Sequence, residues 1–129
     1  MQLKGIHHVA IICSDYEKSK QFYTEILGLA IIREYYRKER DSYKLDLAIG
    51  DSWKIELFSF PSPPPRMSYP EACGLRHLAL AVPSIEDAVK ELREKGIKTE
   101  EIRKDPFTGK SFTFLSDPDG LPIELYESE

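Results

Sequence analysis

The chain has 129 residues, of which 41% are hydrophobic, a size that suits one domain or two fused half-domains. Its net charge of −4, with no stripe of Lys and Arg between aromatic residues, argues against nucleic acid as a partner. No apolar run is long enough to span a membrane, and no basic segment followed by an apolar one opens the chain. We therefore expect a cytoplasmic protein, with Cys13 and Cys73 as reduced thiols.

The first half of the chain predicts one strand, one helix and three more strands. Alternation and β-branched residues predict a strand at Ile6–Ile12. Ser14 and Glu17 resemble a capping box that begins a helix, and Gly28 suits the left-handed position at its end. The three further strands are predicted at residues 30–36, 44–49 and 53–60.

The second half predicts the same order of elements. A strand at residues 75–82 is followed by a helix that Ser84 caps and Gly96 ends. Asp117-Pro118-Asp119-Gly120 is a strong turn signal. Strands are predicted at residues 99–104, 111–115 and 122–126.

These elements predict an α+β fold built from two βαβββ modules. The first module covers residues 5–60, a proline-rich linker covers 61–73, and the second module covers 74–127. Both modules belong to a single domain that spans residues 1–129.

The two modules also share their chemistry-bearing residues. Gly5-Ile6-His7-His8-Val9-Ala10-Ile11 returns as Gly74-Leu75-Arg76-His77-Leu78-Ala79-Leu80, and the segment 53–58 returns as 121–126. His8 thus matches His77, and Glu56 matches Glu124. Imidazole and carboxylate are good ligands for a divalent transition metal, so the repeat suggests one site built from both modules.

Strand parity places all four candidates on the face away from the helices. Residues two apart share a face, so His8 lies with Ala10, and His77 lies with Ala79. The apolar neighbours of Glu56 and Glu124 take the helix side. The same parity places His7 on the helix-packing face, level with Arg76, and excludes it as a ligand.

Taken singly, each candidate has an ordinary explanation. A lone His on a strand is more often a hydrogen-bonded structural residue, and a lone Glu is more often exposed at an edge. A buried carboxylate without a partner is costly, however. Glu56 and Glu124 in matched apolar strands therefore need a cation, and a metal held with His8 and His77 is the simplest one.

The sequence resembles the vicinal oxygen chelate superfamily, and within it the glyoxalase I-like proteins. The landmarks run from Ile6 to Tyr126 and include Phe22-Tyr23 before Leu27-Gly28, Arg76-His77-Leu78-Ala79, and Asp117-Pro118-Asp119-Gly120 before Ile123-Glu124-Leu125. The resemblance implies an eight-stranded, partly open barrel and a homodimer. It also implies the metal ligands His8, Glu56, His77 and Glu124.

Glyoxalase I-like activity is the function that this resemblance implies. Such a lyase acts on the hemithioacetal of a 2-oxoaldehyde such as methylglyoxal and a thiol, usually glutathione, and detoxifies the aldehyde. The metal stabilises an enediolate as a Lewis acid, and a carboxylate moves the proton. By resemblance Glu124 is the first choice for this base and Glu56 the second. The short chain resembles the bacterial form, which favours nickel or cobalt, with zinc as a further option.

The sequence also leaves alternatives open. The stretch Glu56-Leu57-Phe58-Ser59-Phe60-Pro61 departs from the glutathione-recognising pattern, so the thiol is less defined than the metal. Other metal-dependent reactions of the superfamily, namely those of epimerases, dioxygenases and thiol transferases, are alternatives, as is a small-molecule binding or resistance protein. Six cations could meet an acidic substrate, with Lys110 and Arg40 ranked first: Arg37, Arg40, Arg66, Arg76, Arg103 and Lys110.

Overall fold

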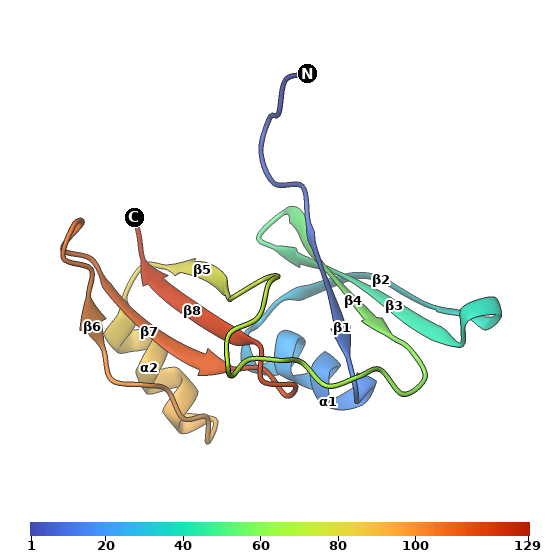
Figure 1. The fold of residues 1–129 in the computed structure, drawn as a ribbon. Helices are drawn as coiled ribbons and strands as arrows, with labels where there is room; N and C mark the ends of the chain where they lie inside the picture. The colour runs from blue at the N-terminus through green and yellow to red at the C-terminus, as the bar shows by residue number, and fades with distance from the viewer. The chain divides into compact units, whose positions relative to one another are not determined.

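The computed structural model describes all residues 1–129, which form two compact units, Met1–Pro65 and Arg66–Glu129 (Figure 1). Each unit contains one four-stranded mixed sheet. No helix in the structure has the length and apolar character needed to cross a membrane.

Unit 1, Met1–Pro65, has a sheet with the strand order β1-β4-β3-β2. β1 pairs with β4 in parallel, and the other neighbours are antiparallel. A π-helical turn at Phe22–Ile26 extends α1, and a 3₁₀ turn at Lys38–Arg40 follows β2. The main elements are β1 (Val9–Cys13), α1 (Tyr16–Gln21), β2 (Ala30–Arg37), β3 (Ser42–Ile49) and β4 (Ser52–Ser59).

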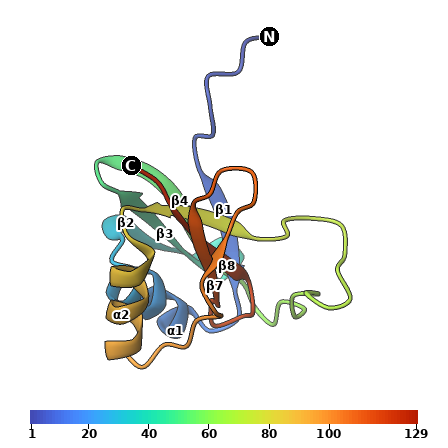
Figure 2. The same cartoon turned by 90° about the vertical axis from the view of Figure 1, so that its left-hand side faces the viewer.

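Unit 2, Arg66–Glu129, repeats this topology with the order β5-β8-β7-β6, and again the first strand is parallel to the last. In both units the helix lies against one face of its own sheet (Figure 2). The predicted α+β class with two βαβββ modules is confirmed. The elements are β5 (Leu78–Val82), α2 (Ile85–Glu94), β6 (Arg103–Lys104), β7 (Ser111–Ser116) and β8 (Pro122–Glu127).

The helix ends follow the predicted signals with one correction. Asp15, not Ser14, caps α1, because the Asp15 carboxylate accepts a hydrogen bond from Lys18 N. Ser84 caps α2 as predicted and accepts from Asp87 N at 3.2 Å. Gly28 and Gly96 both have φ of +77°, a left-handed conformation that favours glycine after a helix.

The first strand of each unit begins later than predicted. β1 begins at Val9, opposite Ile55, so the next pairing partner would be Lys54, which the β3–β4 register skips. β5 begins at Leu78, opposite Ile123, and the next partner would be Pro122, which has no N–H to donate. His8 and His77 therefore lie one residue before their strands rather than within them.

The predicted strand at residues 99–104 is also shorter, because only Arg103–Lys104 pairs with β7. The residues before it are fixed differently. Glu100 N donates to Phe114 O at 2.8 Å, and Thr113 Oγ1 donates to Glu100 O at 2.8 Å.

The core of unit 1 follows the alternation of β3 and β4. Leu45, Leu47, Ile55 and Leu57 are at most 1% exposed, and burying each contributes roughly 1.5–3 kcal/mol. In unit 2, Ile123 and Leu125 are the equivalent buried residues, at 0% and 4% exposed. Glu56 and Glu124 alternate with these residues, so the same pattern that builds each core directs the two carboxylates to the opposite face.

A β-bulge in β4 redirects one aromatic residue. Leu47 pairs with Ile55, but Ala48 pairs with Trp53, so Lys54 is the extra residue. The bulge reverses the parity before it, and Trp53 lies on the same face as Glu56. Its ring stacks on His8 with a centroid separation of 5.5 Å and an interplanar angle of 10°.

Candidate functional site

Unit 1 brings together the predicted pair His8 and Glu56. His8 Nε2 lies 2.7 Å from Glu56 Oε2, and the side chains are 36% and 8% exposed. The parallel register explains the contact. Ala10 lies opposite Glu56, and His8, two residues earlier, faces the same side with only the small Ala10 side chain between them.

Unit 2 repeats the arrangement with His77 and Glu124. His77 Nε2 lies 3.1 Å from Glu124 Oε2, and the side chains are 29% and 14% exposed. Ala79 lies opposite Glu124, as Ala10 lies opposite Glu56. The sequence repeat therefore corresponds to a structural repeat at the level of single atoms.

The structure thus forms two His–Glu pairs, one in each unit. No group of three or more His, Cys, Asp or Glu side chains is close enough together to hold a metal ion. The single site that combines His8, Glu56, His77 and Glu124 stays a prediction.

The donors of the first pair fit a divalent transition metal. Neutral imidazole nitrogen and carboxylate oxygen suit such ions, and both point to one place beside Trp53. His8 Nδ1 lies 2.8 Å from His7 Nδ1, so one of these nitrogens donates to the other. When His8 Nδ1 is the donor, the lone pair of its Nε2 is available to a metal.

The second pair, His77 and Glu124, fits a divalent metal only after the side chain of Arg76 moves. Arg76 Nη1 lies 3.1 Å from His77 Nδ1, and because Arg only donates, Nδ1 accepts. The proton of a neutral His77 then lies on Nε2, between that nitrogen and Glu124. Binding a metal through Nε2 requires this proton to leave and the exposed Arg76 to turn away.

The expectation that His7 lies on the helix-packing face was wrong. His7 is exposed and does not pack on the helix side of the sheet. It contacts His8 and meets Trp53 edge-on at 5.3 Å between centroids. The cause is that β1 begins at Val9, so strand parity does not extend to His7.

Lys44 and Asp46 complete the surroundings of Glu56, and sequence reasoning missed both. Lys44 Nζ lies 2.9 Å from Glu56 Oε1 and 3.0 Å from Asp46 Oδ1. Asp46 is fully buried and also receives the guanidinium of Arg33. Burial lowers the pKa of Lys44, but its hydrogen bonds to Glu56 and Asp46 outweigh this and raise the pKa above its ordinary value.

This cluster corrects the earlier reason for expecting a metal at Glu56. A buried carboxylate needs a cation, and Lys44 already supplies one to Glu56. The antiparallel register was the missing signal, since Asp46 pairs with Glu56, and Lys44 lies two residues away on the same face.

Unit 2 differs from unit 1 at the matching positions. Phe114 pairs with Glu124 as Asp46 pairs with Glu56, and Phe112 stands where Lys44 stands. The ring of Phe114 meets His77 edge-on at 5.3 Å. Glu56 therefore has a lysine on its second oxygen, whereas the corresponding neighbours of Glu124 are aromatic.

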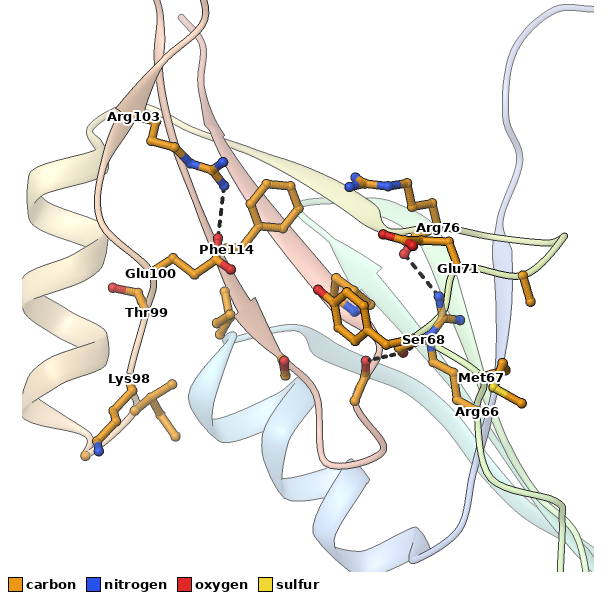
Figure 3. Close-up of a pocket in the computed structure, with 18 residues that line it drawn as sticks. Arg66, Met67, Ser68, Glu71, Arg76, Lys98, Thr99, Glu100, Arg103 and Phe114 are labelled. Carbon is orange, nitrogen blue, oxygen red and sulfur yellow. Dashed lines mark hydrogen bonds and ion pairs between the residues drawn. The ribbon is translucent and has the colours of Figure 1, made fainter.

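A cavity of about 760 Å³ lies in unit 2 (Figure 3). Phe114 lines it and also contacts His77. Arg66, Arg76 and Arg103 contribute cationic groups to its wall, and Arg103 is paired with Glu100 at 2.9 Å. The volume is typical of a small-molecule site.

The chain thus consists of two similar modules, each with a His–Glu pair on the face that its helix leaves uncovered. A family model described as Glyoxalase/Bleomycin resistance protein/Dioxygenase superfamily matches residues 5–125. The chain belongs to this superfamily.

Similar proteins include relatives over nearly the whole length. The uncharacterized protein YwkD of Bacillus subtilis (strain 168) is 66% identical over 127 residues, covering 98% of this chain and 99% of the relative. A crystal structure of SMU.1112c has a TM-score of 0.92 and 50% identity, covering 98% and 100%. A glyoxalase family protein from Enterococcus faecalis has a TM-score of 0.89 and 52% identity, covering 98% and 100%.

More distant relatives carry names that state an activity. A lactoylglutathione lyase of Salmonella typhimurium is 28% identical, covering 95% of this chain and 91% of the relative. The mitochondrial methylmalonyl-CoA epimerase of Bos taurus is 29% identical, covering 98% and 75%. The fosfomycin resistance protein FosX of Listeria monocytogenes, solved as a mutant with Mn(II), shares the fold with a TM-score of 0.73 at 21% identity, covering 99% and 95%.

Proposed function

We propose that the chain is a metal-dependent lyase of the glyoxalase I type. It would move a proton within the hemithioacetal of a 2-oxoaldehyde and a thiol. The observation that carries this proposal is the repetition of one His–Glu pair in both units, at 2.7 Å and 3.1 Å.

The residues that would hold the metal are His8, Glu56, His77 and Glu124. Nickel, cobalt and zinc suit this set of nitrogen and oxygen donors. When bound, the metal supplies Lewis acidity that polarises the substrate carbonyl. The FosX protein, which shares the fold, was solved with Mn(II), and this supports a divalent metal in the proposal.

Glu124 is the proposed general base and acid. Glu56 has His8 on one oxygen and Lys44 on the other, so both of its oxygens are held. Glu124 forms an ion pair with His77 alone, so no cation holds its second oxygen in this way. A carboxylate that can turn is better suited to take a proton from one carbon and return it to the next.

The neighbouring aromatic residues favour this proton transfer. Phe112 and Phe114 replace the charged pair of unit 1, so the surroundings of Glu124 are less polar. Apolar rings beside the carboxylate keep competing water away from the place where the proton moves.

The relatives support the reaction class. One is named lactoylglutathione lyase and another methylmalonyl-CoA epimerase, and both reactions move a proton next to a carbonyl. The family pattern usually has Gln at the position of Glu56 in acyl-CoA epimerases, so Glu56 favours the lyase. The homodimer and the cytoplasmic location stay predictions, which light scattering and cell fractionation check.

The test is turnover of methylglyoxal with glutathione on protein stripped of metal and reloaded with nickel, cobalt or zinc. We expect metal-dependent thioester formation with kcat/KM of about 10⁴ M⁻¹s⁻¹ or more. Stoichiometric metal without turnover would reject the lyase on this substrate, and the search would move to other thiols and vicinal-oxygen compounds.

A further inference from the structure

The guanidinium of Arg37 has a hydrogen-bonding capacity that its own module satisfies only in part. It ends β2, and its Nη2 donates to Ser42 Oγ at 3.0 Å. Its guanidinium lies 5.0 Å from the Phe58 ring centre and 5.9 Å from that of Phe60. Arg37 Nε is buried and has no hydrogen-bond partner. A buried donor without an acceptor costs about 1–3 kcal/mol, so an acceptor is missing from this place.

Two neighbouring cations on this face are already paired with carboxylates. Arg33 binds Asp46, and Lys44 binds both Asp46 and Glu56. Arg37 forms no ion pair.

Unit 2 provides an internal comparison for this stacking. Arg103 lies 5.0 Å over Phe112, as Arg37 lies over Phe58. Arg103, however, has Glu100 as its counter-ion at 2.9 Å. Arg37 therefore lacks the counter-ion that Arg103 has in the matching stack of unit 2.

The position of Arg37 relates it to the candidate metal ligands. Phe58 follows Glu56 by two residues in β4, which keeps it on the same face and places it roughly 7 Å further along the strand. A group bound over Phe58 would thus lie roughly 7 Å from Glu56 along the strand, a distance that a small molecule can span.

We propose that Arg37 binds an oxyanion group of the substrate, a carboxylate or a phosphate, above the ring of Phe58. The substrate class is then a vicinal-oxygen compound that carries an anionic group a few bonds away. The vicinal-oxygen end of this substrate rests on the proposed function. The planar fork of Arg suits either oxyanion, and Arg40, 5.4 Å from Phe60, adds a second positive charge nearby.

The first test needs no metal and no turnover. Chelator-treated, full-length protein labelled with ¹⁵N is titrated with sodium phosphate and, separately, with sodium acetate, while the arginine Nε–H resonances are followed. We expect a saturable shift of the Arg37 resonance with one of these anions, which also identifies the preferred oxyanion. A shift no larger than that of exposed Arg93 on α2 would overturn the proposal.

Three variants separate anion binding from a purely structural role. Arg37→Gln should lose at least tenfold in affinity for the anion, and Lys38→Gln, which removes the same charge from a neighbouring exposed residue, should lose less than threefold. Ser42→Ala removes the contact that a structural role would use, and should lower the unfolding midpoint without abolishing anion binding. An equal loss of anion affinity in all three variants would overturn the proposal.

A second test addresses the substrate class on metal-loaded protein. Acetohydroxamate and the monohydroxamate of succinate carry the same pair of vicinal oxygens, and only the second carries a carboxylate. We expect about tenfold tighter binding of the succinate probe, and loss of that preference in Arg37→Gln. Equal affinities of the wild type for both probes would reject this substrate class. A protein that binds phosphate at Arg37 but binds no metal would keep the anion site and reject the proposed lyase.

Discussion

Lys44 Nζ lies 2.9 Å from Glu56 Oε1, while Glu56 Oε2 faces His8 Nε2 at 2.7 Å. The lysine therefore fixes which oxygen of the carboxylate is presented to the histidine. Glu124 has no such partner, so the two matched glutamates are chemically unequal.

Replacing Lys44 separates its charge from its hydrogen bond. Both Lys44→Gln and Lys44→Met remove the positive charge, but only Gln can still donate to Glu56. Because such partners orient metal ligands, we expect Lys44→Gln to bind nickel about tenfold more tightly than Lys44→Met. Competition with a coloured chelator measures both affinities. Equal values would show that Lys44 acts through charge alone.

The two glutamates should fail in different ways when each is changed to Gln. Glu124→Gln should keep the fold and lower kcat by at least about 10²-fold per bound metal, because the base is lost. Glu56→Gln should mainly weaken metal binding, because Lys44 holds Glu56 in place as a ligand. Turnover is normalised to metal content measured in the same sample. Normal kcat in Glu124→Gln would remove Glu124 from the base role.

Arg76 should oppose metal binding at His77. Its Nη1 donates to His77 Nδ1 at 3.1 Å and so keeps the imidazole proton on Nε2. Arg76→Gln should therefore raise metal affinity by roughly threefold to tenfold, the net value of one ordinary hydrogen bond, because Arg76 is exposed. Arg93→Gln on α2 is the matched control for lost positive charge. Unchanged or weaker binding in Arg76→Gln would contradict the assignment of the proton to Nε2.

The repeat in the sequence predicted most of the fold and the matched positions of the two His and the two Glu, for a physical reason. Strand alternation fixes the face of every second residue, so the apolar Ile55 and Leu57 determine where Glu56 points. Matching segments in one chain then place Glu124 in the same way.

What the sequence did not predict depends on register. The bulge at Lys54 redirects Trp53 onto His8, and no residue type in the segment signals it. Lys44 and Asp46 lie opposite Phe58 and Glu56 only because β3 and β4 pair in one particular register. The ranking of Lys110 and Arg40 as anion-binding residues used their position in turns. It did not use the partners that each cation meets, because these depend on register.

The contacts of Glu34 should make the free energy of unfolding fall slightly at acid pH. Hydrogen bonds from Lys20 and Tyr16 lower the pKa of Glu34 below its ordinary value of 4.5. Because the folded pKa is the lower one, this stability is present above pH 4.5 and is lost as the pH falls through the folded value.

Urea unfolding at about pH 6 and about pH 3 measures this effect. The wild type should lose about 0.5 kcal/mol more than Glu34→Gln over this range, a value reduced for solvent screening of a partly exposed pair. Glu39→Gln, an exposed residue in the 3₁₀ turn, should behave like the wild type. An equal acid dependence in Glu34→Gln would contradict the stabilising role of the Glu34 contacts.

Calorimetric titration of chelator-treated protein with nickel, cobalt and zinc tests the central claim most directly. We predict one ion per chain in the wild type, and affinity reduced by at least about tenfold in His8→Ala and Glu56→Gln of unit 1 and in His77→Ala of unit 2. Two ions per chain, or a loss confined to the variants of one unit, would contradict a single site shared by both His–Glu pairs.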